Sequence, residues 1–182
     1  MRLENRTVKL KDGRPCLLKS PAEEDAEEMI VHLRQTSGET DFMARYEDEI
    51  RITPDEEKRY LSGLLADPRS LLITALIDGR VAAAAGFNPV SPNEKYRHRA
   101  VFGISVKKAY WGLGVGSSVL EAVIEAAKAA GYGQLELEVV SDNERAVALY
   151  QKHGFIIYGT RERSFLLRDG SCRAEHLLLL KL

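Results

Sequence analysis

The sequence predicts a single α/β domain over residues 1–182, in which helices pack on a mixed, mostly antiparallel sheet. Three observations support this prediction. Apolar runs and amphipathic segments alternate along the chain in the order β-α-α-β-β-β-α-β-α-β-β. Asp78-Gly79 separates two apolar runs, which is a strong signal for a β-hairpin. The 182 residues are 45% hydrophobic and 29% charged, as expected for one globular domain.

Charge and cysteine content exclude several classes of protein. The chain has 26 Lys+Arg and 27 Asp+Glu, so its net charge of −1 gives no overall field that would attract nucleic acid or an acidic membrane. Cys16 and Cys172 lie far apart and outside any C-x-x-C motif, which argues against a disulfide scaffold and against a zinc site. Two free thiols fit a reducing cytoplasm. No metal is expected.

Two further absences favour a soluble, cytoplasmic protein without membrane contact. Residues 1–6 have no apolar core, so they do not resemble a signal peptide. No apolar run approaches the roughly 20 residues of a membrane helix.

The first third of the chain predicts a strand and two helices. A strand at residues 16–19 precedes Ser20, which is the expected N-cap of a helix with Pro21 at its first position and Ser37-Gly38 at its end. Residues 38–52 are rich in charge and read as a loop. Thr53, with Glu56 three residues later, predicts a capping box that opens the second helix. The expected buried stripe of this helix is Tyr60, Leu61, Leu64 and Leu65.

The rest of the chain alternates between strands and two more helices. The hairpin strands are residues 71–77 and 81–87, and the predicted helices are 116–130 and 143–153. Gly131 and Gly154 follow the two helices at positions typical of C-terminal caps. The remaining predicted strands are 100–106, 135–139, 155–158 and 177–180, which makes about seven strands and four helices in all.

A glycine-rich turn lies between a predicted strand and the third helix. Gly112, Gly114 and Gly116 leave the backbone open just where the helix begins, so its amides and dipole can close on a phosphate or pyrophosphate. Ser117 and Ser118 add hydroxyl donors.

The spacing of the glycines separates three phosphate-binding designs. No Lys follows them, which excludes a Walker loop. A dinucleotide fingerprint would need glycine where Ser117 stands, and it would follow the first strand rather than a hairpin. On the glycines alone, a tight turn without a ligand stays open as an alternative.

A second motif, in residues 143–155, narrows the choice. Together with Trp111-Gly-Leu-Gly-Val-Gly116, it resembles the GNAT superfamily of acetyl-CoA-dependent N-acetyltransferases. The family turn reads Arg/Gln-x-x-Gly-x-Gly/Ala, and Trp111 stands at its first position. The residues that match the later family motif are Asn143, Ala146, Leu149, Tyr150, Gly154 and Phe155.

The resemblance implies acetyl-CoA as cosubstrate and a sheet that splays between its fourth and fifth strands. The coenzyme pyrophosphate would lie on the backbone amides of residues 113–117, a site that the loss of the family's Arg or Gln would weaken rather than abolish. The pantetheine arm would pair with the strand that contains Ile104 and Val106. The implied coenzyme-binding residues are Ile104, Ser105, Val106, Trp111, Gly112, Leu113, Gly114, Val115, Gly116, Ser117, Ser118, Asn143, Ala146 and Tyr150.

The implied reaction is direct attack of a primary amine on the acetyl group in a ternary complex. By resemblance, Tyr150 is the general acid that protonates the leaving thiolate. Glu138 is the leading candidate for the base, because it ends its strand at the proposed splay. Weaker candidates are Glu39, Glu47, Glu49, Tyr96, His98 and Glu136. Arg161, Arg163 and Arg168 read as solvated charges.

The acceptor is expected to be a small-molecule or peptide amine. The acidic loop 39–49 hints at a cationic amine, although it also contains Arg45. A non-catalytic acyl-CoA-binding module and a protein-interaction module with the same fold stay open as alternatives. Family members often dimerise, so the resemblance also implies a homodimer, for which no sequence feature indicates an interface.

Overall fold

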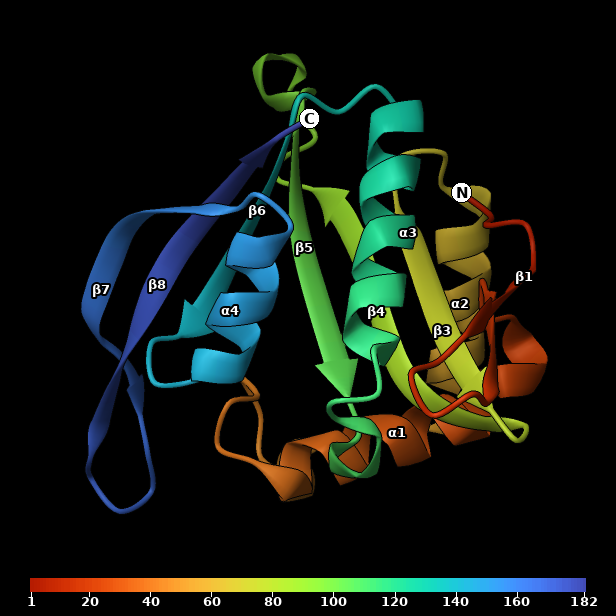
Figure 1. Cartoon of the computed structure of the whole chain (residues 1–182), viewed down its shortest axis with the longest axis horizontal. Helices are drawn as coiled ribbons and strands as arrows, with labels where there is room; N and C mark the ends of the chain where they lie inside the picture. Colours follow the sequence, from red (N-terminus) through yellow and green to blue (C-terminus); the bar gives the residue numbers. More distant parts are fainter.

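One eight-stranded sheet runs through the computed structural model, which describes all 182 residues. The strand order is β1-β2-β3-β4-β5-β6-β8-β7, and six of the seven neighbouring pairs are antiparallel, with β5–β6 parallel (Figure 1). The predicted fold class is therefore confirmed. The strands are β1 (Arg6–Lys9), β2 (Pro15–Lys19), β3 (Leu71–Ile77), β4 (Arg80–Pro89), β5 (Arg99–Val106), β6 (Gln134–Val140), β7 (Ile156–Leu166) and β8 (Cys172–Lys181).

Four α-helices cover the two faces of the sheet (Figure 1). α3 (Val115–Ala129) and α4 (Glu144–Lys152) lie on one face, and α1 (Ala26–Glu39) and α2 (Pro54–Ala66) lie on the other. Each face has its own apolar cluster, so the sheet is buried on both sides along its centre. No helix combines the length and the apolar character that crossing a membrane requires.

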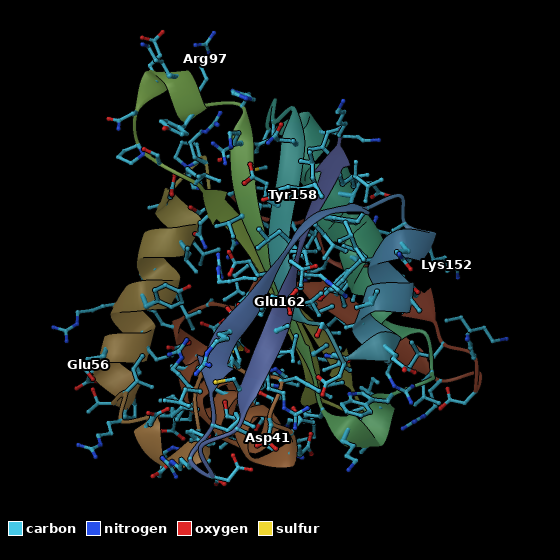
Figure 2. The ribbon with its side chains drawn as sticks, turned by 90° about the vertical axis from the view of Figure 1, so that its left-hand side faces the viewer. Asp41, Glu56, Arg97, Lys152, Tyr158 and Glu162 are labelled. Carbon is cyan, nitrogen blue, oxygen red and sulfur yellow. The ribbon has the colours of Figure 1, made fainter.

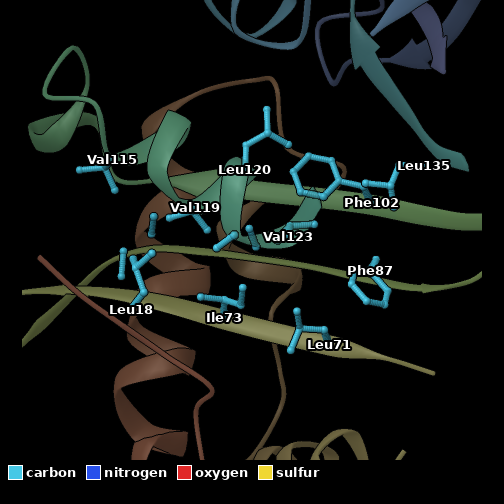
Figure 3. Close-up of a cluster of buried hydrophobic side chains, with 14 of the residues drawn as sticks. Leu18, Leu71, Ile73, Phe87, Phe102, Val115, Val119, Leu120, Val123 and Leu135 are labelled. Carbon is cyan, nitrogen blue, oxygen red and sulfur yellow. The ribbon is translucent and has the colours of Figure 1, made fainter. Parts of the chain in front are cut away.

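The larger cluster forms where α3 packs on the central strands. On α3, Leu120 and Val123 follow Val119 by one and by four residues, so the three side chains share one face of the helix. All three are fully buried. They pack over side chains such as Ile73 and Phe87 from the middle of the sheet (Figure 3). This packing fixes the start of α3 beside the end of β5, where the glycine-rich turn lies.

Eight strands form, whereas the sequence predicted about seven. β1 was missed because its four residues alternate Arg, Thr, Val and Lys, and only Val8 packs against the core. β7 and β8 are also longer than predicted. β7 is an edge strand with a largely exposed, charged centre, so it lacks the apolar run that marks a buried strand.

The predicted start of the first helix is wrong. The Ser20 hydroxyl accepts a hydrogen bond from the Leu3 amide at 3.0 Å and caps no helix. A 3-10 turn at Glu23–Asp25 follows, closed by the Asp25 carboxylate on the Ala22 amide at 2.8 Å, and α1 begins only at Ala26. At the other end, α1 continues through Gly38 to Glu39, since an isolated glycine near a helix end is tolerated.

The second helix and the hairpin form where the sequence predicted them. The Thr53 hydroxyl accepts from the Glu56 amide at 3.3 Å, and the Glu56 carboxylate accepts from the Thr53 amide at 2.8 Å. Asp78 and Gly79 both have positive φ, as a tight hairpin turn requires. The predicted stripe of α2 is only partly right, because Leu61 is buried but Tyr60 is 48% exposed.

The sheet splays between β5 and β6, as predicted. These strands pair only at Arg99–Val101 with Gln134–Glu136, and then diverge. An ion pair between Arg99 and Glu136, at 2.8 Å, lies in this last paired stretch. The backbone of β5 beyond residue 101 therefore has no partner strand on the β6 side.

Candidate active site

A cleft of about 680 Å³ opens where β5 and β6 diverge. Its lining comes from both faces of the sheet, so the cleft passes through the splay rather than lying on one side. The lining from the first face includes Val115, Gly116 and Ser117 of α3 and Ala146, Leu149 and Tyr150 of α4. The lining from the second face includes Met29, Leu33 and Thr36 of α1 and Glu57 and Tyr60 of α2.

The glycine-rich turn has the geometry of an anion site. Gly112 and Gly114 have φ of 80° and 94°, values that favour glycine, and α3 starts directly after Gly114. The Ser118 amide makes the first bond of the helix, to the Gly114 carbonyl at 3.1 Å. The preceding amides thus have no partner within the helix, and the helix dipole adds positive charge at this point.

Trp111 closes the turn onto β5. Its indole Nε1 donates to the Val106 carbonyl at 2.8 Å. The guanidinium of Arg145, from the first turn of α4, stacks over the indole ring at 5.1 Å. The residue that departs from the family motif therefore has a structural role here, and it holds a cation at the mouth of the cleft.

Three cationic residues line the cleft. Lys11, Arg145 and Lys152 all line it. The Lys11 amide also donates to the Leu113 carbonyl at 3.0 Å, which ties the β1–β2 loop to the glycine-rich turn. Sequence reasoning missed these three residues because Lys11 lies far from α4, which holds Arg145 and Lys152, and only the fold brings the two segments to one cleft.

The open edge of β5 presents backbone groups to the cleft. The Lys107 amide donates to the Ala82 carbonyl of β4 at 2.9 Å. Because backbone groups alternate along an antiparallel strand, those of Ile104 and Val106 point the other way, into the splay. The Val106 carbonyl is occupied by Trp111, which leaves the Val106 amide and both polar groups of Ile104.

Tyr150 lines the cleft from α4. Its ring packs edge-on against Phe102 at 6.1 Å between centroids and lies 5.8 Å from that of Phe155. The residue is 6% exposed, and no protein group forms a hydrogen bond with its hydroxyl. Burial raises the pKa of this phenol, so it keeps its proton at neutral pH.

Asn143 caps α4 and lines the cleft at the same time. Its Oδ1 accepts from the Ala146 amide at 3.3 Å, which leaves the side-chain amide NH₂ free. Not every predicted coenzyme-binding residue reaches the cleft, since Leu113 packs on the core and Ser118 lies outside the lining.

Glu138 lines the cleft but has a cationic partner. Arg161 donates to its two carboxylate oxygens at 2.8 and 3.0 Å and lowers the pKa of Glu138. Arg161 also contacts Glu175 at 3.3 Å, so this exposed side chain, which the sequence indicated as a solvated charge, is also paired with two acids. A carboxylate stabilised in this way is a weaker proton acceptor.

The other candidate bases are scattered. Glu39 lines the cleft, where it accepts from the Lys108 amide at 2.6 Å. Tyr96 and His98 lie before the start of β5, at the end of the strand remote from the splay. Of the arginines that the sequence indicated as solvated charges, Arg168 pairs with Asp48 at 2.7 Å. Glu47, Glu49, Glu136 and Arg163 do not line the cleft.

Glu57 is a cleft residue that the sequence analysis missed. It reads as one of the acidic residues common in the first turn of a helix. A signal was present, however, because Glu57 lies three residues before Tyr60 and four before Leu61, on the stripe predicted to be buried.

These features define a class of α/β protein with a cleft through a splayed sheet and a helix start suited to an anion at its border. A family model described as the Acetyltransferase (GNAT) family matches residues 27–155, and the chain belongs to this family. A GNAT-family acetyltransferase from Streptococcus pneumoniae superposes with a TM-score of 0.88 at 32% identity, over 92% of this chain and 99% of that one.

Two further relatives carry more specific names. The L-amino acid N-acetyltransferase AaaT of Escherichia coli is 34% identical over 108 residues, which are 58% of this chain and 65% of that protein. The structure of yncA from Salmonella typhimurium with its cofactor acetyl-CoA has a TM-score of 0.80 at 15% identity, over 96% of this chain and 95% of that one. The chain spans less than two thirds of the length of the curated relatives that it matches.

Proposed function

We propose that this chain is an N-acetyltransferase that moves the acetyl group of acetyl-CoA to a primary amine by direct attack in a ternary complex. The observation that carries the proposal is the single cleft through the splayed sheet, which is lined by the glycine-rich turn and a buried phenol on one face and by a buried acid, Glu57, on the other. Donor and acceptor can therefore enter from opposite faces and meet between β5 and β6.

The donor half of the cleft suits coenzyme A. The amides of Gly114–Ser117 would bind the pyrophosphate, and Lys11, Arg145 and Lys152 would add positive charge around it. The free backbone groups of Ile104 and the Val106 amide would pair with the amides of the pantetheine arm. The free NH₂ of Asn143 would donate to the same arm. This arrangement brings the thioester to Tyr150.

Two effects would accelerate the reaction. Holding the amine and the thioester together replaces a bimolecular encounter, and effective molarities in model reactions reach about 10⁵ M or more. As the C–S bond breaks, the Tyr150 phenol would protonate the sulfur, because a thiolate left without a donor in this buried place would be strongly disfavoured. Glu138 borders the same space, but its ion pair with Arg161 disfavours it as a base.

The direct test is release of coenzyme A in the presence of acetyl-CoA and a panel of primary amines. We expect thiol release that requires both substrates and an acetylated amine detected by mass spectrometry. Tight acetyl-CoA binding with no turnover on any amine would instead favour a non-catalytic acyl-CoA-binding module. Failure to bind acetyl-CoA would contradict both.

A further inference from the structure

Glu57 is a buried carboxylate without a partner. It lies in α2, is 2% exposed, and lines the cleft on the face opposite to Tyr150. No side chain or backbone group forms a hydrogen bond or an ion pair with its carboxylate. Buried carboxylates are normally paired, so a lone one that faces a cavity is suited to bind a cation that enters the cavity.

The surroundings of Glu57 form a pocket with a flat floor. Ala84 and Gly86 of β4 and Gly103 of β5 lie side by side in the cleft lining. A Cβ at Gly103 would meet no atom within 4 Å, so open space lies above this residue. A molecule between Glu57 and the splay therefore has room to reach the thioester site.

The walls of this pocket are mainly apolar. Met29 and Leu33 of α1 line one side, and Phe42 and Met43 of the following loop line another. The nearby acids Glu138 and Glu175 share Arg161, so neither needs a further cation. The pocket thus combines mainly apolar walls with Glu57, the one acid of the cleft lining that has neither an ion pair nor a hydrogen bond.

We propose, on the basis of the acetyltransferase function proposed above, that Glu57 binds the ammonium group of an acceptor with an apolar body and takes its first proton. The ammonium group would be the missing partner of the carboxylate, and the walls would cover the body. Burial raises the pKa of Glu57, which makes it a better proton acceptor than an ordinary glutamate.

The protons balance in this scheme. The ammonium gives one proton to Glu57, and the freed lone pair forms the C–N bond with the thioester carbonyl carbon. The C–S bond breaks, the sulfur takes the Tyr150 proton, and the second nitrogen proton restores the phenol. Glu57 then releases its proton to solvent, so one ammonium and one thioester give one amide, one thiol and one proton.

The test compares two acceptors of similar shape in wild type and Glu57→Gln. Phenethylamine is an ammonium ion at neutral pH, whereas phenylacetic hydrazide is neutral and needs no initial deprotonation. We expect Glu57→Gln to lower kcat/KM for phenethylamine roughly 10- to 100-fold, the range for losing a charged hydrogen-bond partner. For the hydrazide we expect a change of less than about threefold.

Glu56→Gln is the matched control. Glu56 lies on the outer side of α2 (Figure 2), and a glutamine there preserves the capping box. This variant should retain wild-type kcat/KM for both acceptors. Calorimetric titration with acetyl-CoA should give the same Kd for wild type and both variants, which shows that each is folded.

Equal losses on the two acceptors with an unchanged Kd for acetyl-CoA would assign Glu57 a structural role and overturn the inference. Wild type that binds acetyl-CoA but acetylates only the hydrazide would also overturn it. Wild type that binds no acetyl-CoA would be a failure of the proposed function, which this design separates from a failure at Glu57.

Discussion

Tyr150 combines two properties at the scale of a single residue. Its ring belongs to the aromatic group with Phe102 and Phe155, while its hydroxyl faces the cleft without a protein partner. The structural and chemical roles of the residue can therefore be separated by removing the oxygen alone.

We predict that Tyr150→Phe lowers kcat about 100-fold or more, because general-acid catalysis contributes about 10²–10⁴-fold. The Kd for acetyl-CoA should change by less than about threefold, since the ring and its packing remain. Steady-state thiol release and calorimetry measure the two quantities. Full kcat across the pH range in this variant would show that another group protonates the sulfur.

His32 is buried completely and titrates far from its ordinary range. Its Nε2 lies 2.8 Å from the Ser105 hydroxyl, its Nδ1 has no partner, and burial, with Lys107 nearby, lowers its pKa to about 4. The unfolded chain protonates this histidine near pH 6.5, but the folded protein does not. Stability should therefore fall as the pH drops from about 6.5 towards 4.

We predict that the free energy of unfolding loses about 2 kcal/mol through His32 between pH 7.5 and pH 5. His32→Gln can still bond to Ser105 but does not titrate, so its stability should depend less on pH by that amount. Urea unfolding at the two pH values measures both proteins. An identical pH dependence in the variant would contradict the assignment.

At the scale of an element, the start of α3 is the feature on which the proposed binding of coenzyme A depends. The same helix has glycines with positive φ at both ends, Gly114 at 94° and Gly131 at 77°. Both positions have room for a methyl group, so alanine would strain the backbone without a clash at either one. Only Gly114 borders the cleft.

We predict that Gly114→Ala and Gly131→Ala each destabilise the protein by about 1–2 kcal/mol. Gly114→Ala should also raise the Kd for acetyl-CoA about tenfold or more, because the amides at the start of α3 turn away from the pyrophosphate. Thermal unfolding and calorimetry give the two effects. If the variants weaken binding equally, the turn is not the anion site.

At the scale of the whole molecule, the sequence predicted those elements that have a local signal. The Thr53 capping box, the Asp78-Gly79 turn and the apolar stripe of α3 each depend on residues close together in the chain, and each forms as predicted. β1 and most of β7 carry no such signal. Their polar residues become strands because a neighbouring strand supplies the hydrogen bonds.

The candidate site also divides into parts that have a local sequence signal and parts that do not. The turn at 112–117 and the Asn143–Tyr150 segment are each continuous in sequence, and most of their residues line the cleft. Three features are visible only in the folded chain. Two of them join distant segments, namely the stacking of Arg145 on Trp111 and the pairing of Arg161 with Glu138. The third is the absence of a partner for the Glu57 carboxylate. Local pattern therefore indicated the side of the cleft proposed to bind the donor, and the side proposed to bind the acceptor is recognised only in the folded chain.

The central claim is that the cleft through the splayed sheet binds acetyl-CoA. Calorimetric titration of the protein with acetyl-CoA tests it most directly, with NADH and ATP as controls that share the pyrophosphate chemistry but lack the pantetheine arm. We predict a micromolar Kd for acetyl-CoA and much weaker binding of both controls. No binding of acetyl-CoA, or equal binding of all three ligands, would contradict the account.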